Sequence, residues 1–212
     1  METTENNITA ERSLEIIRNS IEQSRRDIER GSWKDMMFWG IVVVLIALMV
    51  AYLWENTSMG GGANGLWGLC GIAPFLERRL LRKQFRKPAT FISKTLGYVW
   101  GSFAIMAGSL GFICFPLVAL YTKEVNPAVV PMIYLPITAI IILFMGLAGM
   151  ISGRILGSGA ITVCCFLSGA LGSVAALVFP GPNEMIVLAA VSFVGLIIPA
   201  LIIRGKEKKE AR

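Results

Sequence analysis

The chain has 212 residues, of which 55% are hydrophobic and 16% charged, with a formal net charge of +6 and no histidine. This length suffices for six membrane helices, an N-terminal segment and short connections, and it leaves no room for a second globular domain. The basic residues lie beside apolar runs, where they would orient membrane helices next to anionic headgroups. This accounts for the positive net charge, and we expect no nucleic-acid partner.

Residues 1–35 form a polar leader, in which a helix is predicted from about Thr9 to a stop at Gly31. Between these two residues five basic and five acidic side chains cancel, so the helix lacks the basic face of an electrostatic membrane anchor. Its apolar stripe predicts a contact with a partner helix or with the chain's own loops, and it consists of Leu14, Ile17, Ile21 and Ile28.

Six apolar runs follow within residues 36–203, each close to the roughly 20 residues that a helix needs to cross hydrocarbon. We therefore expect an all-α, polytopic membrane protein with a six-helix bundle. The predicted spans are 37–54, 60–76, 95–121, 128–151, 159–179 and 185–203, and residues 204–212 form a basic tail.

The basic residues are distributed unevenly among the segments that join these spans. Nineteen of the twenty Lys and Arg residues fall on the side of the two termini, and only Lys123 falls on the other side. Short loops rich in Lys and Arg remain in the cytoplasm, so both termini are predicted to be cytoplasmic. The densest run would also contact anionic lipid, and it comprises Arg78, Arg79, Arg82, Lys83, Arg86 and Lys87.

The second span, 60–76, is the weakest because six glycines crowd a stretch that is barely long enough to cross. A re-entrant loop is the alternative, but it would leave the basic run on the outer face, against the charge rule. Proline within the third, fourth and sixth spans predicts kinks, which neighbouring helices repair or which serve as gating hinges; these residues are Pro116, Pro131, Pro136 and Pro199.

No Asp, Glu, Lys or Arg lies within a predicted span, and without histidine no Ser–His or Cys–His pair exists. We therefore expect neither an enzyme nor a cofactor. Adjacent Cys164 and Cys165 point about 100° apart on a helix, so packing is favoured over binding of a soft metal ion. Small residues spaced four apart, such as Gly149 and Gly153, predict close helix packing or an oligomer interface.

Two functions are compatible with this pattern. The leading interpretation is a non-enzymatic accessory or regulatory subunit that acts through its leader helix on a second copy or on another protein at the membrane. The alternative is a facilitative channel or carrier for a small neutral or lipophilic solute, with a path at Asn64, Gly65 and Gly68.

Several short stretches resemble a family of uncharacterised small six-span inner-membrane proteins of Bacteroidota-type bacteria. They are Ser13–Ile17, Gly31–Ser32, Phe38–Gly40, Asn64–Trp67, Arg86–Pro88, Tyr98–Trp100, Leu143–Leu147 and Gly195–Pro199. Thr90–Lys94 departs from the family pattern, where an Asp-Arg pair is expected. The resemblance implies a bacterial cytoplasmic membrane location, and it implies no catalytic activity.

Overall fold

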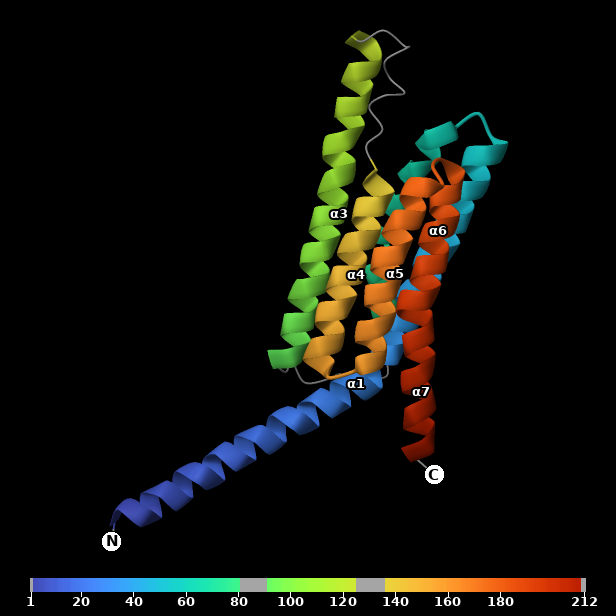
Figure 1. The fold of residues 1–212 in the computed structure, drawn as a ribbon. Coiled ribbons are helices and arrows are strands. Elements are labelled where there is room, and N and C mark those ends of the chain that lie inside the picture. The colour runs from blue at the N-terminus through green and yellow to red at the C-terminus, as the bar shows by residue number, and fades with distance from the viewer. Residues whose placement is uncertain (1, 81–90, 125–135, 211–212) are drawn as a thin grey trace.

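The computed structural model describes residues 2–80, 91–124 and 136–210, and every regular element among them is helical (Figure 1). The all-α prediction is therefore confirmed. In chain order the elements are α1 (Glu2–Asn56), the 3₁₀ helix η1 (Gly60–Gly71), α2 (Ala73–Leu80), α3 (Phe91–Glu124), α4 (Ile137–Leu156), α5 (Gly159–Val178), α6 (Pro182–Ser192), the π-helical turn η3 (Phe193–Ile197) and α7 (Ile198–Glu210).

Among the described residues, five helices are long and apolar enough to cross a membrane. They cover Arg12–Asn56, Phe91–Ile113, Ile137–Leu156, Gly159–Val178 and Pro182–Lys209. The fourth predicted span is displaced along the chain, because α4 begins after Pro136 and ends at Leu156. Proline removes one backbone donor and disfavours helix in the residue before it, which places this helix start at the proline.

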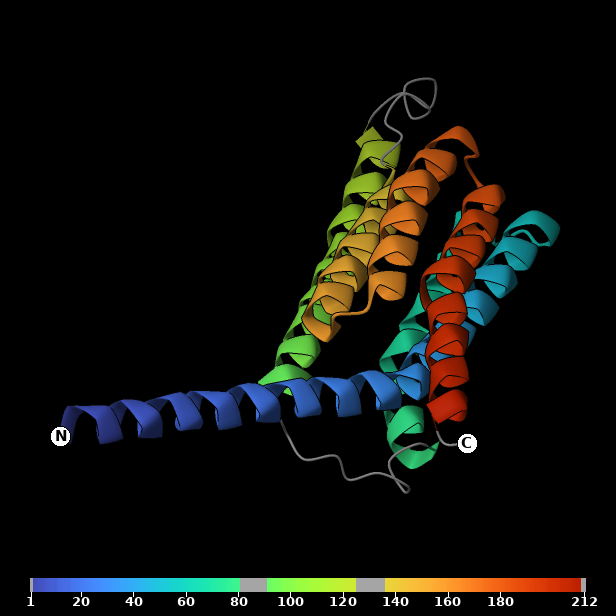
Figure 2. The same ribbon diagram turned by 60° about the horizontal axis from the view of Figure 1, so that its bottom comes forward.

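Helix α1 is continuous through Gly31, so the predicted stop at this residue is wrong. A glycine inside a helix costs only about 1 kcal/mol relative to alanine, and contacts on both sides of Gly31 offset that cost. Residues 2–30 of α1, here called the arm, leave the bundle at an angle and extend past the end of α3 (Figures 1 and 2).

The second predicted span is the exception to regular α-helix. Four of its glycines, at positions 62, 65, 68 and 71, recur every third residue, and a 3₁₀ helix has three residues per turn. They therefore share one edge of η1, where an added Cβ would find no atom within 4 Å. The other two edges carry Ala63, Leu66, Trp67 and Cys70, which pack against the core.

This segment returns along α1 towards the arm. At one end the ring of Trp54 lies 3.6 Å from the position of a Cβ on Gly61. At the other end Nε1 of Trp39 donates a hydrogen bond to Oε2 of Glu77 at 3.3 Å. Together η1 and α2 thus pair with α1 from Trp54 back to Trp39.

Helices α4 and α5 form the closest helix pair in the bundle, because glycines remove the side chains that would separate them. A Cβ on Gly146 would lie 2.5 Å from Cα of Gly169, and one on Gly153 would lie 2.6 Å from the backbone nitrogen of Thr162. A Cβ on Gly149 would lie 2.8 Å from the Cβ of Cys165. The expectation of close packing at Gly149 and Gly153 is confirmed, whereas Gly97, Gly101, Gly108 and Gly111 of α3 have open space around them.

The predicted repair of a proline break is observed in the last span. Pro199 has no N–H to donate to the carbonyl of Gly195, four residues earlier. The chain forms the π-helical turn there, with the N–H of Ile198 bonded to the carbonyl of Phe193. Sγ of Cys165 lies 3.2 Å from the carbonyl oxygen of Gly195 and donates to it from α5. A neighbouring helix therefore satisfies the freed acceptor.

The α4–α5 contact generates a testable prediction. Gly169→Ala places a methyl group 2.7 Å from Cα of Gly146, and the backbones must separate, so we expect a loss of about 1–3 kcal/mol in the free energy of unfolding. Gly108→Ala is the matched control, because its methyl group meets nothing within 4 Å. Equilibrium unfolding in mixed detergent micelles measures both, and equal stability of the two variants would contradict the packing described.

Candidate functional site

The most highly connected polar region of the described structure is the place where the arm meets the bundle, here called the arm junction. Three elements contact α1 there. They are the C-terminal end of α4, the polar C-terminal half of α7, and α2. The arm junction comprises Arg25, Trp33, Trp39, Glu77, Arg154, Ile155, Gly157, Arg204 and Glu207.

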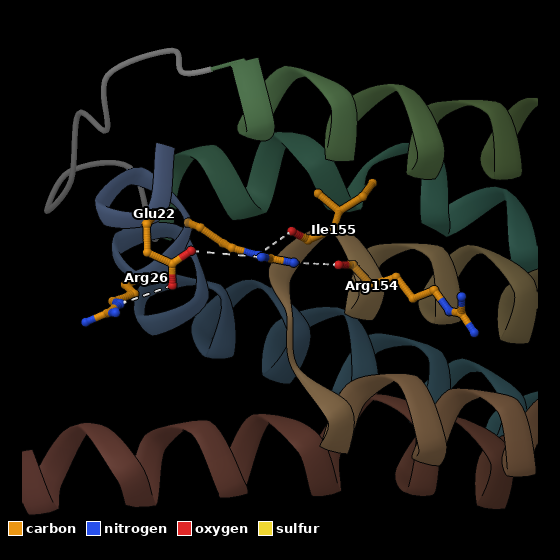
Figure 3. A network of polar contacts seen from close by, with 5 residues as sticks. Glu22, Arg26, Arg154 and Ile155 are labelled. Atoms are coloured by element: carbon orange, nitrogen blue, oxygen red, sulfur yellow. Dashed lines mark hydrogen bonds and ion pairs between the residues drawn. The ribbon is translucent and has the colours of Figure 1, made fainter. Parts of the chain in front are cut away.

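Arg25 binds the C-terminal end of α4 (Figure 3). Its Nε donates to the carbonyl of Ile155, and one terminal guanidinium nitrogen donates to the carbonyl of Arg154, both at 2.8 Å. These carbonyls belong to the last turn, which carries partial negative charge, and that of Arg154 also accepts a hydrogen bond from the N–H of Gly157. A guanidinium supplies both the donors and the opposite charge.

Gly157 makes room for this contact. It has φ +70°, and its N–H bonds to the carbonyl of Arg154 while the N–H of Ser158 bonds to that of Gly153. This is the Schellman arrangement that ends many helices. A Cβ on Gly157 would lie 2.8 Å from the central guanidinium carbon of Arg25. The residue that terminates α4 thereby also opens its end to the arm.

Glu22 contributes little to this contact. Glu22 lies 4.0 Å from Arg25 and 3.4 Å from Arg26, and all three side chains are partly or largely exposed. Exposed ion pairs of this kind contribute about 0–1 kcal/mol. The side chain of Arg154 points away from Arg25, so only its carbonyl takes part (Figure 3). The attraction is therefore between one cation and a helix end.

Trp33 joins the same region to α7. Its indole nitrogen donates to Oε2 of Glu207 at 2.7 Å, and the guanidinium of Arg204 lies 5.0 Å from the ring centroid. Beneath these polar contacts Ile28, Trp33 and Met36 pack with Ile92 and Leu96 on a buried cluster. That cluster consists of Leu156, Ile161, Cys165 and Ile203. The arm junction thus combines an apolar layer with a polar rim.

The structure separates the four residues of the predicted leader stripe. Ile28 packs on the bundle, whereas Leu14, Ile17 and Ile21 are 67%, 54% and 56% exposed. The C-terminal end of the stripe therefore contacts helices of the chain's own bundle rather than its loops, and contact of the exposed remainder with a partner helix stays a prediction. Within the predicted basic run Arg79 is exposed, whereas Arg82, Lys83, Arg86 and Lys87 and the side chain of Arg78 lie outside the described residues.

Two residues of the predicted solute path, Gly65 and Gly68, lie on the open glycine edge of η1, whereas Asn64 lies on the edge that also carries Trp67 and Cys70. Nδ2 of Asn64 donates to the carbonyl of Gly61 at 3.1 Å, and an added Cβ on Gly65 or Gly68 would meet no atom within 4 Å. The hollow lined by Met145, Gly146, Cys165, Ser168, Gly195 and Leu196 lies elsewhere, between α4, α5 and η3, and leaves no room for a water molecule.

Sequence reasoning missed two polar side chains. Arg25 entered the sequence analysis only as one of the basic residues of the leader, because no pattern in the neighbouring sequence indicates a hydrogen-bond partner 130 residues away. Glu184 was assigned to a loop, but it lies in the first turn of α6, is 5% exposed, and accepts a hydrogen bond from the N–H of Gly181 at 3.1 Å. Its position just before an apolar run was a recognisable helix-start signal.

Comparison with known proteins gives no relative: no protein-family model, curated protein or solved structure matches the chain.

The arm junction leads to a prediction about Arg25. Arg25→Ala removes two charge-assisted bonds from the end of α4, and because the side chain is 35% exposed we expect a loss of about 1–2 kcal/mol. Faster hydrogen exchange in residues 20–30 and 153–158 would report it. Arg26→Ala is the control, since Arg26 is 67% exposed and, among the described residues, bonds to the exposed Glu22 alone. Unchanged exchange in Arg25→Ala would refute the role assigned to this residue.

Proposed function

We propose that this chain is a non-enzymatic six-span protein of a bacterial cytoplasmic membrane that acts as an accessory or regulatory subunit. In this proposal both termini are cytoplasmic. The arm and the neighbouring basic segment make the contacts that carry the function, and the bundle holds them at the membrane.

The observation that carries the proposal is the attachment of the arm by Arg25. Two 2.8 Å bonds to the end of α4 fix one end of the arm, while the part before residue 25 projects beyond the bundle (Figures 2 and 3). An arm that served only to cover its own bundle would keep its apolar residues inside. Leu14, Ile17 and Ile21 are instead more than half exposed, which favours a role in contacts outside the bundle.

The path of η1 and α2 supports a sixth crossing. A 3₁₀ helix rises about 2.0 Å per residue, so the twelve residues of η1 cover about 24 Å before α2 begins. The α-helical stretch from Trp39 to Trp54 covers about 22 Å at 1.5 Å per residue. The two lengths agree, and with α2 the segment approaches the roughly 30 Å of a hydrocarbon layer. Placement of nineteen of twenty basic residues on one side supports the orientation.

The solute-path alternative has less support. Among the described residues no atom lies within 4 Å of a Cβ placed on Gly65 or Gly68, and the hollow between α4, α5 and η3 has no room for a solute. We therefore place the function in contacts made by the arm.

Crosslinking in intact cells tests this role. A tagged copy at native level is compared with a version that lacks residues 1–31, and the captured proteins are identified. We expect a specific partner that is lost with the arm. Arg26→Ala serves as a control with the arm intact. Capture of the same proteins by both forms, or of the chain alone, would refute the proposed role and direct effort to solute flux in liposomes.

Labelling with a membrane-impermeant maleimide tests the topology. Ser58→Cys lies before η1, and Gln84→Cys lies in the basic segment after α2. We expect the first to react in intact spheroplasts and the second only after permeabilisation, since a complete crossing separates them. Reaction of both from the same side would instead establish a re-entrant segment.

A further inference from the structure

The apolar stripe of the arm shares a helix face with the contacts of the arm junction. At 3.6 residues per turn, Leu14, Ile17 and Ile21 lie with Arg25 and Ile28 in one sector of about 80°. Arg25 and Ile28 define where this sector points, because the first binds the end of α4 and the second packs on the cluster below it. Because α1 is a continuous helix, the stripe points in the same direction, towards the end of the bundle where α4 terminates.

That level has the residues typical of a membrane–water interface. Trp33 and Trp39 lie there with their indole N–H groups bonded to Glu207 and Glu77. Tryptophan is enriched where hydrocarbon meets headgroups, because its ring is apolar and its N–H polar. Helix α3 also carries exposed apolar side chains on the outside of the bundle, such as Phe91 and Tyr98. They begin at the same end, next to Ile92, which packs on the cluster beneath the arm junction.

We infer that the occupant of the stripe is the lipid surface beside α3, with the arm lying along the headgroup boundary and Leu14, Ile17 and Ile21 immersed in it. The stripe continues an interface already formed with the membrane end of the bundle. No separate protein is needed to cover it. This inference rests on the proposed role of the arm and deepens it, because protein partners would then meet the opposite, polar face.

The chemistry of the contact is apolar rather than electrostatic. The arm as a whole has five basic and seven acidic residues, so it has no net attraction to anionic headgroups. Three aliphatic side chains supply the affinity, and attachment at Arg25 keeps them close to the surface. Immersion is therefore expected in neutral as well as in anionic lipid.

Depth-dependent quenching tests the inference in the full chain, reconstituted at one copy per nanodisc. An environment-sensitive fluorophore is attached at Ile17→Cys, and at Asn19→Cys as the matched control about 160° round the helix. Both positions are exposed, so neither substitution disturbs the bundle. The chain without an added cysteine, labelled identically, gives the background from native cysteines.

We expect nitroxides carried on the lipid chains to quench most of the emission at position 17 and little at position 19, equally in phosphatidylcholine and in phosphatidylglycerol nanodiscs. Water-like emission at both positions would overturn the inference. So would quenching that requires anionic lipid, or shielding of position 17 that appears only with two copies per disc, which would assign the stripe to a second copy.

The outcome is independent of the crosslinking experiment. Immersion of Ile17 with no partner lost on deletion of residues 1–31 would retain the lipid contact and reject the accessory role. Loss of a partner with a water-exposed Ile17 would do the reverse.

Discussion

The structure depends on supplying partners to backbone groups that an α-helix cannot satisfy by itself. In hydrocarbon no water is available, and each unpaired N–H or C=O costs several kcal/mol. One site inside the bundle and one at its partly exposed end show how this chain supplies such partners. Arg25 supplies donors to the end of α4, and Cys165 supplies one to the carbonyl that Pro199 leaves free. In each case a residue distant in sequence completes a helix, so backbone satisfaction and tertiary packing are achieved by the same contacts.

Glycine has two opposite uses in this bundle. On α4 and α5 it permits contact between backbones, as at Gly146 and Gly169. On η1 its three-residue spacing selects a 3₁₀ helix and leaves an open edge, while the side chains of Leu66 and Trp67 face the core. The spacing of glycine, rather than its amount, distinguishes the two cases.

The sequence was sufficient for those features that depend on local pattern. Runs of about twenty apolar residues predicted the long helices, and proline predicted the break near Pro199. It failed where a weak local signal was overridden: Gly31 does not end α1, because Arg25, Ile28 and Trp33 hold the helix on both sides of it. The contact between Arg25 and α4 could not be predicted from the sequence. The chain has many basic residues that could bind a helix C-terminus, and only the tertiary structure shows which of them lies there.

The continuity of α1 fixes the helical phase between membrane and arm. Gly40 sets the rotation of the membrane part, because a Cβ there would lie 2.7 Å from Ile197. Each residue between Gly40 and Arg25 then adds about 100° of rotation. Insertion of one residue would turn the arm's contact face away from the bundle, whereas insertion of seven would restore its direction to within about 20° and displace it by about 10 Å. The length of this connection is therefore constrained in units of whole helical turns, in addition to the side-chain contacts that Ile28, Trp33 and Trp39 make along it.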